Sequence, residues 1–385
     1  MYPTISFLIK DLTGIYIPLP IQTFGLFVAV AFISGAYFIS LELRRKEKEG
    51  LISSIKKRVK IGEGITTYEF FNSIISGFLI GFKLVEAILD YDSLVQNPQE
   101  FLFSTKGSLL GGVIFSIIFL VKKYKEKEKN KLEKPQLKVI TIQPHQLLGN
   151  MMMIAAISGV IGAKIFASLE NWNDFIIDPI SNLLSFYGLT FYGGLIFGAI
   201  SVCYYAQKNG IKLLHIMDVF APSLILSYGI GRIGCHLSGD GDWGIVAGDQ
   251  PDWWFLPDWI WSYNYPNNVL GLDTKIPGCE GEFCYQLAEN VYPTPLYEIA
   301  MSGIIFIILW KMRKKIKVAG ILFFTYLSLN GLERFLIEKI RVNTKYDIFG
   351  GITQAEIISF CLILIGIFGI IFLKIKENEE IKLQQ

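Results

Sequence analysis

Long apolar segments, separated by short polar linkers, run through most of this chain. Most of them approach the roughly 20 residues that an α-helix needs to cross a bilayer, and the third is the shortest. The pattern predicts an all-α polytopic membrane protein with about nine transmembrane helices. The predicted spans are 21–41, 68–89, 107–121, 146–168, 187–206, 215–233, 295–311, 319–338 and 354–374.

The linkers between these spans alternate in charge. Lys and Arg dominate 44–60, 122–134 and 311–317, whereas the intervening loops 90–106 and 169–186 contain only one lysine between them. Because basic loops stay cytoplasmic, the N-terminus is predicted to lie outside and the C-terminus in the cytoplasm. The basic residues of these linkers are better explained by their role in orienting the protein in the membrane than by binding to anionic lipid or nucleic acid. No nucleic-acid partner is expected.

The composition agrees with a membrane-embedded protein. Of the 385 residues, 52% are hydrophobic and 18% are charged, which is too little charge to cover a soluble protein of this size. The N-terminal MYPTISFLIKDLTG lacks the basic n-region of a cleavable signal peptide. No two of the five cysteines form a CxxC pair, so no metal site is expected.

A hairpin of two helices occurs twice in the sequence. GFLIGFK (77–83) is followed by GGVIF (111–115), and GVIGAK (159–164) is followed by GGLIF (193–197). The small residues are expected to let the helices of each hairpin pack closely, with a lipid-binding role as the alternative.

Each copy of the hairpin also contains a lysine inside a predicted span, Lys83 in the first and Lys164 in the second. A charge at that depth is costly and usually faces a polar cavity. Lys164 is the stronger candidate for contact with a substrate, because its hairpin leads into the most charged part of the sequence.

That charged part is GIGRIGCHLSGDGDWG (229–244), which directly follows an apolar run and contains Arg232. A later helix contains Arg334, Glu338 and Arg341 at i, i+4 and i+7, and therefore on one face. Both segments are predicted to end at the outer surface, where phospholipid phosphates lie. Guanidinium groups match phosphate oxygens, although pairing of these arginines with nearby carboxylates is the alternative.

The segment 229–244 resembles the signature of the prolipoprotein diacylglyceryl transferases, roughly Gly-Arg-x-Gly-Asn-Phe-x-Asn-Gly-Glu-x-Trp-Gly. Further matches fall in the order of that family: TFGLFVAVAF (23–32), FYGGLIFG (191–198), MDVFAP (217–222), TPLYE (294–298) and ERFLIEKIR (333–341). The resemblance covers about 15–41 and 146–374. The hairpin at 68–121 is extra, and takes the usual seven membrane helices of the family to nine.

The resemblance implies an enzyme of the bacterial cytoplasmic (inner) membrane. Such an enzyme moves the diacylglyceryl group of phosphatidylglycerol to the lipobox cysteine thiol of a prolipoprotein, and releases glycerol-1-phosphate. The expected partners are therefore phosphatidylglycerol, the lipobox peptide and the membrane. The protein is expected to be a monomer without cofactor or metal.

The matching positions, together with the charged residues around them, define an expected site. The predicted catalytic residues are Arg334, Tyr192, Asp240, Asp242 and Glu298, and the predicted substrate-binding residues are Arg232, Arg334, Lys164, Ser238, Glu338 and Arg341. The expected organisation is an N-terminal arm with the first helix and a basic linker (1–67), the extra hairpin with a basic loop (68–142), core helices with the signature loop (143–244), an extracytoplasmic head (245–293) and C-terminal core helices with a cytoplasmic tail (294–385).

Several positions depart from the family pattern. Tyr192 replaces the family histidine before Gly-Gly, Cys235 replaces the first signature asparagine and Ser238 replaces the second. A phenol with an ordinary pKa near ~10 is a poor base, which leaves a carboxylate or His236 as the proton acceptor. A family member that only binds lipid or lipoprotein remains the alternative. An intramembrane serine protease, suggested by HLSG (236–239), is a weaker alternative. Such an enzyme needs a histidine on another helix near the serine, and no other predicted span offers one at that depth.

The predicted head carries four tryptophans, Trp253, Trp254, Trp259 and Trp261, which suit either a lipid interface or a small packed core. Cys279 and Cys284 lie on the oxidising side and are expected to form a disulfide. The Asp-Gly-Asp run at 240–242 lacks the later ligands of a calcium loop.

Overall fold

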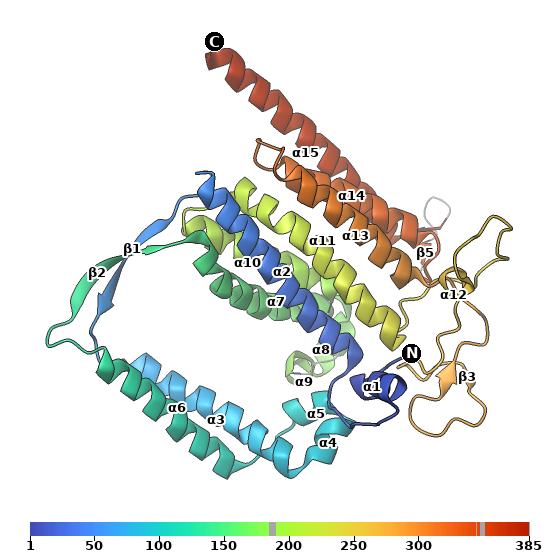
Figure 1. Cartoon of the computed structure of the whole chain (residues 1–385), viewed down its shortest axis with the longest axis horizontal. Helices are drawn as coiled ribbons and strands as arrows, with labels where there is room; N and C mark the ends of the chain where they lie inside the picture. Colours follow the sequence, from blue (N-terminus) through green and yellow to red (C-terminus); the bar gives the residue numbers. More distant parts are fainter. Residues whose placement is uncertain (185–189, 344, 347–350, 385) are drawn as a thin grey trace. The chain divides into compact units, whose positions relative to one another are not determined.

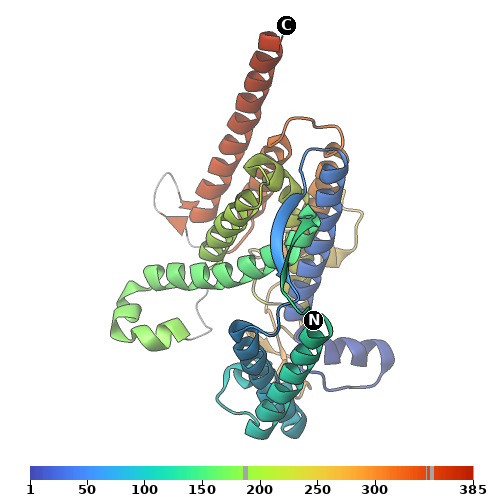
Figure 2. The same cartoon turned by 90° about the vertical axis from the view of Figure 1, so that its left-hand side faces the viewer.

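The computed structural model describes residues 1–184, 190–343, 345–346 and 351–384. The chain is mostly helical and divides into two compact units. One unit comprises Met1, 27–55 and 142–385, and the other comprises 2–26 and 56–141. Figures 1 and 2 show the chain from two sides.

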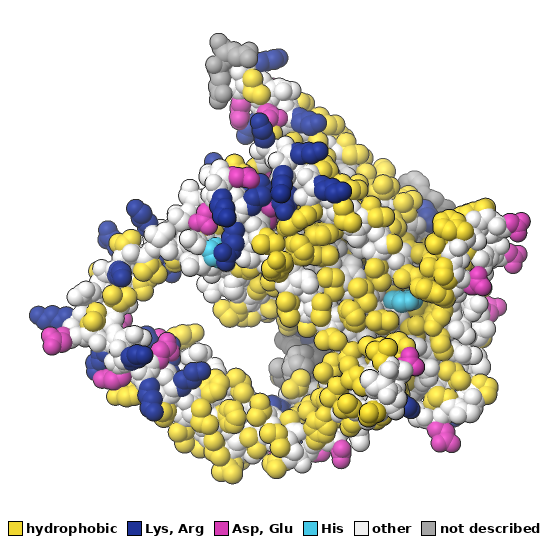
Figure 3. All heavy atoms as spheres, in the orientation of Figure 1, with side chains coloured by type: hydrophobic (Ala, Val, Ile, Leu, Met, Phe, Trp, Pro, Cys, Tyr) yellow, Lys and Arg dark blue, Asp and Glu magenta, His cyan; other side chains and the backbone are white. Residues whose placement is uncertain are grey.

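Six helical segments among the described residues are long and apolar enough to cross a membrane. They are α2 (Thr23–Lys48), α3 (Thr67–Leu89), η1 (Pro144–Leu147) with α7 (Leu148–Glu170), α11 (Leu213–Ser238), α13 (Thr294–Met312) and α15 (Gln354–Gln384). Large apolar side chains are exposed along these helices and cover much of the face seen in Figure 3. The protein is therefore an all-α membrane protein, as the hydrophobic pattern predicted.

Three further helices occupy the remaining predicted spans. They are α6 (Leu109–Lys129), α10 (Phe191–Lys208) and α14 (Ile321–Glu338). Residues 187–189, the predicted start of the fifth span, lie outside the described residues. The total of nine spans and the orientation in the membrane stay predictions. The helix α2 continues beyond the predicted end at 41, because its charged last turns are also good helix formers.

The remaining elements are short. The helices are α1 (Ile5–Thr13), α4 (Tyr91–Gln96), α5 (Pro98–Phe103), α8 (Trp172–Ile177), α9 (Pro179–Leu184) and α12 (Asp258–Trp261). Three two-stranded sheets pair β1 (Ile55–Ile61) with β2 (Gln136–Ile142), β3 (Thr274–Lys275) with β4 (Tyr285–Gln286), and β5 (Lys345–Tyr346) with β6 (Ile352–Thr353).

The hairpins α3–α6 and α7–α10 are built alike. In each, two glycines face each other where the helices cross, Gly81 with Gly111 and Gly162 with Gly193. A methyl group on any of the four would overlap a carbonyl oxygen of the facing helix. Glycine therefore permits a helix contact that no other residue allows at these positions.

The lysine of each hairpin binds backbone carbonyls of the short helices that connect its two long helices. Lys83 Nζ donates to the carbonyl oxygens of Phe101 at 2.7 Å and Ser104 at 2.6 Å, and Lys164 Nζ donates to that of Asn182 at 2.8 Å. These carbonyls lie in or directly after the last turns of α5 and α9, where no intrahelical donor is available. Both lysines thus hold the connecting segment of the hairpin to the helix from which they extend.

The core of the first unit surrounds α11, which packs against α10, α13 and α14 (Figure 1). Asp218 of α11 is buried, and its carboxylate accepts hydrogen bonds from Gly320 N at 2.9 Å and Phe323 N at 3.0 Å. It also binds Lys46 Nζ at 3.2 Å. The Asp of MDVFAP therefore caps the first turn of α14, which accounts for an acidic residue inside an apolar segment.

The C-terminal helix α15 packs along α14. Gly331 of α14 lies against Ser359 O, and Gly366 and Gly369 of α15 lie against Phe324. Figures 1 and 2 show the last turns of α15 projecting past the other helices of this unit. These turns carry the charged sequence KIKENEE, which needs no apolar partner.

The segment predicted as a head has a small core of its own, formed by Tyr265, Leu287 and Val291. Cys279 and Cys284 form the expected disulfide within it. The four tryptophans divide into packed and exposed side chains, and contact of the exposed pair with lipid stays a prediction. Trp254 and Trp261 pack edge to face, and Trp261 also contacts Tyr292, whereas the side chains of Trp253 and Trp259 are exposed.

Candidate functional site

Four segments meet at the end of α11: its last turns, the loop 239–244, the start of α13 and the end of α14. Helix α11 stops at Gly239, whose φ of 66° is the left-handed conformation that favours glycine at a helix end. The backbone of Gly244 then donates to Tyr292 O at 2.8 Å, and Ile245 N donates to Ile340 O at 2.8 Å. These bonds hold the loop beside both later helices.

Glu298 lies at the centre of this arrangement and is fully buried, with 0% of its side chain exposed. Its Oε2 is 3.1 Å from Arg232 Nε, and its Oε1 is 3.3 Å from Arg334 Nη1 and 3.5 Å from Arg341 Nη1. Tyr228 OH donates a hydrogen bond to the same Oε1 at 2.7 Å. One carboxylate therefore binds three arginines that come from α11, α14 and the residues after α14.

Asp242 connects two of these arginines a second time. Its Oδ2 pairs with Arg232 and its Oδ1 pairs with Arg341. Thr294 Oγ1 donates to its backbone oxygen at 2.6 Å, which fixes the loop against the start of α13. Burial raises the pKa of the Asp242 carboxyl, but the two guanidinium groups outweigh burial and hold that pKa below its ordinary value.

Arg334 has a second partner on its own helix. Its Nη2 lies 2.9 Å from Glu338 Oε2, one turn later along α14. Glu338 also accepts a hydrogen bond from Asn343 Nδ2 through its other oxygen. Arg334, Glu338 and Arg341 therefore all pair within the cluster. The prediction that they share one helical face was wrong for Arg341, because α14 ends at Glu338 and Arg341 reaches the cluster from the residues after it.

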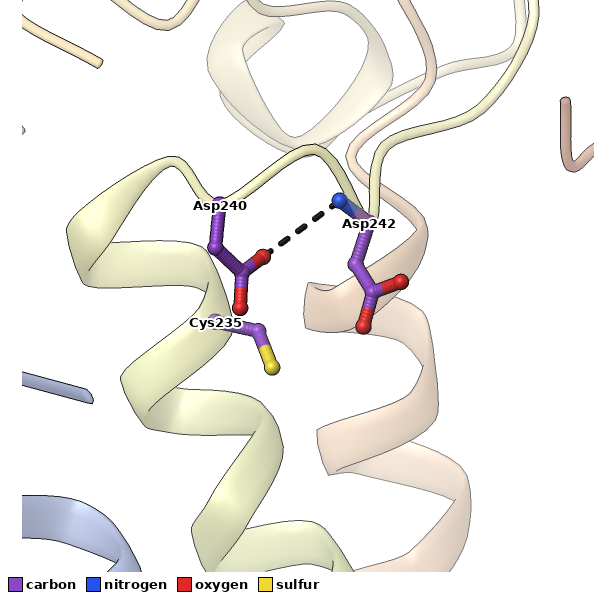
Figure 4. Close-up of side chains that lie close together, drawn as sticks. All are labelled: Cys235, Asp240 and Asp242. Carbon is purple, nitrogen blue, oxygen red and sulfur yellow. Dashed lines mark hydrogen bonds between the residues drawn. The ribbon is translucent and has the colours of Figure 1, made fainter. Parts of the chain in front are cut away.

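Cys235, Asp240 and Asp242 lie together at the edge of the cluster (Figure 4). Asp240 Oδ1 accepts a hydrogen bond from Asp242 N at 3.3 Å, and Arg232 Nη1 lies 3.8 Å from Cys235 Sγ. Burial raises the pKa of the Asp240 carboxyl above its ordinary value. Among the described residues no arginine pairs with Asp240, which distinguishes it from Asp242 and Glu298.

The three side chains offer ligand atoms within 4.8 Å of one another, close enough for a metal ion. Their surroundings do not fit one. Both carboxylate oxygens of Asp242 already hold guanidinium groups, and a divalent cation would stand beside two positive charges. The neighbouring guanidinium groups therefore favour an anion at this place over a metal ion.

Three other predicted residues lie on α7, on α10 and in the last turn of α11. Ser238 is buried, and its hydroxyl donates to Gly234 O at 2.8 Å within the last turn of α11. Tyr192 lies in the first turn of α10. Lys164 binds the connecting segment of its hairpin, as described above. Their contact with a substrate stays a prediction.

The sequence analysis missed two residues of the cluster. Tyr228 supports Glu298 by its hydroxyl, and its ring centroid lies 4.9 Å from the Arg232 guanidinium carbon. Its position one turn before Arg232 was a usable signal. Glu333 is 1% exposed, and neither carboxylate oxygen has a hydrogen-bond partner among the described residues. Only its place directly before Arg334 could have drawn attention to it.

His236, considered as a proton acceptor, faces the head instead. Its Nδ1 lies 3.3 Å from Tyr265 OH, and its ring packs edge to face against Tyr265. The protease alternative fails on distance. His215 is 23 residues before Ser238 on the same helix, or about 34 Å along the axis.

Three guanidinium groups thus converge within reach of one another, balanced by the carboxylates of Asp242, Glu298 and Glu338. Such a site can hold an anion with two or more oxygens if one carboxylate yields its place. Fold and site together define a polytopic helical membrane protein with an arginine–carboxylate cluster at one end of its helices.

Comparison with known proteins places this chain within one family. A family model described as prolipoprotein diacylglyceryl transferase matches residues 128–372, so the chain belongs to that family. The predicted extra hairpin at 68–121 lies outside the matched range.

Relatives in three bacteria carry the name phosphatidylglycerol--prolipoprotein diacylglyceryl transferase. The protein of Clostridium botulinum (strain Langeland) is 31% identical over 231 residues, which are 60% of this chain and 81% of the relative. That of Lysinibacillus sphaericus is 27% identical over 241 residues, or 62% and 81%. That of Staphylococcus aureus (strain MSSA476) is 30% identical over 233 residues, or 60% and 75%.

Proposed function

We propose that this protein transfers the diacylglyceryl group of phosphatidylglycerol to the lipobox cysteine thiol of a prolipoprotein. A thioether forms and glycerol-1-phosphate is released. Membership of the family and the names of the relatives support this assignment. The enzyme works in the bacterial cytoplasmic membrane as a monomer, with nine spans, the N-terminus outside and the cluster at the outer surface.

The observation that carries the proposal is the convergence of Arg232, Arg334 and Arg341 on Glu298. A phosphodiester offers two charged oxygens that match such guanidinium groups. Asp242 is the carboxylate that yields, because its side chain is 30% exposed and lies on a loop, whereas that of Glu298 is 0% exposed on a helix. The lipid phosphate then takes the Asp242 positions on Arg232 and Arg341.

The chemistry follows from this placement. The substrate thiolate attacks the glyceryl carbon that bears the phosphate ester. The new carbon–sulfur bond forms as the carbon–oxygen bond breaks, and the electron pair of that bond stays on the phosphate oxygen. Negative charge therefore grows on the leaving phosphate monoester, where the fixed guanidinium groups stabilise it. Arg334 is catalytic in this scheme, and Glu298 and Glu338 hold the arginines in position.

The substrate thiol must lose a proton before it attacks, because the thiolate is the nucleophile. Asp240 is the proposed acceptor. Its carboxyl pKa is raised by burial, and it carries no guanidinium partner among the described residues. A base with a raised pKa, nearer the working pH, holds the proton more effectively than an ordinary aspartate. Tyr192, at the family histidine position, is the alternative acceptor.

The direct test is complementation of a bacterial strain depleted of its own diacylglyceryl transferase. The full chain is expected to restore growth, and mass spectrometry of a marker lipoprotein should detect the diacylglyceryl thioether on its lipobox cysteine. Expression and membrane insertion without any thioether would refute transfer.

A second candidate function is lipid or lipoprotein binding without catalysis, which the Tyr192 and Cys235 replacements favour. Binding of phosphatidylglycerol by the purified protein, with no thioether product, would identify that function. The two candidates therefore give opposite results in the mass-spectrometric assay and the same result in the binding assay.

A further inference from the structure

A second group of charged side chains surrounds a small open pocket at the opposite end of α11. The last turns of α2, the first turns of α11 and the segment between α13 and α14 form its walls. His215, which lines it, precedes Arg232 by 17 residues, or about 25 Å along the helix. The pocket is therefore separate from the arginine–carboxylate cluster.

The pocket has an excess of positive charge. Two carboxylates line it, and both are occupied: Glu42 pairs with Arg45, and Asp218 binds Lys46 and the backbone of α14. The four cations that line it are Arg45, Lys46, Arg313 and Lys317. Glu49, outside the pocket, pairs with Arg45 as well. The four cations thus face three carboxylates, Glu42, Asp218 and Glu49, and one positive charge has no carboxylate among the described residues to balance it.

Arg313 is the least satisfied of these cations. Its side chain is 10% exposed, and its Nε lies 3.5 Å from Glu42 Oε2 without forming a hydrogen bond. The guanidinium carbon lies 3.4 Å from the ring centroid of Trp310, which shields it from solvent. Burial lowers the pKa of this guanidinium, and Glu42 offsets only part of that effect. The buried Nδ1 of His215 also lacks a hydrogen-bond partner among the described residues.

We infer that this pocket binds a single phosphate group, supplied by the head of an anionic phospholipid in the cytoplasmic leaflet. One phosphate would accept hydrogen bonds from the buried Arg313 guanidinium, which has no hydrogen-bonded acceptor in the described part of the chain, and would neutralise the surplus positive charge. The pocket as it stands is only about large enough for a water molecule, so a phosphate group would enter it as the exposed side chains at its mouth move aside. Lys317 is exposed and can move aside to admit it.

The apolar part of the lining decides between lipid and free phosphate as the source. Leu51, Val318 and Leu322 lie on the same walls as the cations, where the glycerol and first methylene groups of a lipid would pack. Figure 3 shows Lys and Arg side chains gathered over this end of the helices, which the charge pattern assigns to the cytoplasm. The basic linker 311–317 thus binds a ligand in addition to setting orientation.

The test uses the full-length protein in detergent and measures its thermal unfolding temperature. The probes are dihexanoyl phosphatidic acid, inorganic phosphate and zwitterionic dihexanoyl phosphatidylcholine. Phosphatidic acid is expected to raise the unfolding temperature of the unmodified chain, and phosphatidylcholine is not. Lys317→Gln and Arg313→Gln should each weaken the apparent affinity for phosphatidic acid by about tenfold, the loss of one charge-assisted contact.

Lys314→Gln is the matched control, because it removes the same charge from the same loop outside the pocket. It should leave the affinity unchanged. Lys317 is exposed, so its replacement gives a result even if Arg313→Gln prevents folding. The response should also persist in Arg232→Lys, which separates this pocket from the proposed transfer site.

The outcomes are distinct. An equal shift with inorganic phosphate alone would keep the phosphate site but identify free phosphate as its source. Equal weakening by Lys314→Gln and Lys317→Gln would reduce the effect to general attraction by a basic loop and overturn the proposal. Absence of any shift with either anionic probe would overturn it as well.

Discussion

At the scale of single residues, Glu298 organises the cluster. Its carboxylate is fully buried and touches three guanidinium groups and one phenol. A buried ion pair contributes little net stability, but removal of one partner leaves an uncompensated buried charge. The arrangement therefore fixes the positions of the arginines more than it stabilises the fold. Preorganised donors of this kind lower a barrier without reorganisation during the reaction.

The first prediction concerns Arg232. Arg232→Lys should reduce thioether formation by about 10²- to 10³-fold, the cost of removing one preorganised donor from developing negative charge. The ammonium keeps the charge but cannot contact Asp242 and Glu298 through separate nitrogens. Turnover is measured by mass spectrometry of a lipobox peptide in detergent. Arg44→Lys, an exposed position on α2, is the matched control, and equal activity of both variants would remove Arg232 from the mechanism.

The second prediction concerns Asp240 and pH. Its carboxyl pKa is raised by burial, and the proposed role requires the ionised form. Turnover should therefore be full above that pKa and fall as the pH decreases through it, at a higher pH than an ordinary aspartate would give. Asp240→Asn should lower turnover by about 10²-fold and abolish this acid limb. A pH profile that is identical in the variant would transfer the role to Tyr192, which Tyr192→Phe then tests.

At the scale of elements, the two hairpins show how small residues and one lysine build the same unit twice. The glycine pairs set the distance between helices, and Lys83 and Lys164 bind the segments that connect the two helices of each hairpin. The sequence analysis proposed that Lys164 contacts a substrate, because a charge inside a span usually faces a polar cavity and its hairpin leads into the charged segment; that contact stays a prediction. The structure adds a backbone carbonyl of a neighbouring short helix as a partner, which sequence spacing does not reveal.

The third prediction tests the close contact of α7 and α10. Gly162→Ala should lower the unfolding temperature of the purified protein, because the added methyl group overlaps Gly193 O and the Phe197 side chain. Overpacking of this kind costs about 1–3 kcal/mol. Gly159→Ala is the control, since its nearest atom outside its own helix would be Gly194 O at 3.5 Å. Equal unfolding temperatures for the two variants would contradict the contact.

At the scale of the whole molecule, the chain belongs to a transferase family, and the interpretation of the first hairpin as an addition to the family core stays a prediction. The family match covers 128–372 and leaves the segment 68–121 outside. Two helices can be added to a membrane protein without reversing the helices after them, because an even number of spans returns the chain to the same side. The matched residues also contain all members of the arginine–carboxylate cluster.

The fourth prediction follows from that arrangement. Deletion of 68–121 with the reading frame kept should preserve thioether formation within about threefold, because no cluster residue is lost and the orientation of the later helices is kept. Deletion of the equivalent part of the second hairpin, 149–203, should abolish activity. That segment contains Tyr192, and its Met151 and Val202 belong to the core around α11. Loss of activity in both deletions, with normal protein levels, would give the first hairpin a role in transfer.

Much of this architecture could be predicted from the sequence. Each predicted span overlaps a helix of the described residues, because a run of apolar residues in a bilayer must satisfy its own backbone hydrogen bonds. The pairing of Arg334 with Glu338 was also predictable, since it depends only on the 3.6-residue period of a single helix. The placement of Arg341 on the same helix was wrong, because α14 ends at Glu338. Tyr228 and the crowded setting of Cys235 were not recognised, although both lie within one turn of Arg232.

The sequence by itself determined which segments are helices and that arginines stand near the ends of two of them. The local pair of Arg334 with Glu338 follows from the helix period, but only the tertiary structure decided which carboxylates distant in the chain hold the arginines. Arg341 pairs with Asp242, which is 99 residues away in the sequence, and Arg334 pairs with Glu298, which is 36 residues away. Such pairs depend on how helices cross and how the loops between them bend. Local periodicity carries no information about either, because both are set by packing between segments that are distant in the chain.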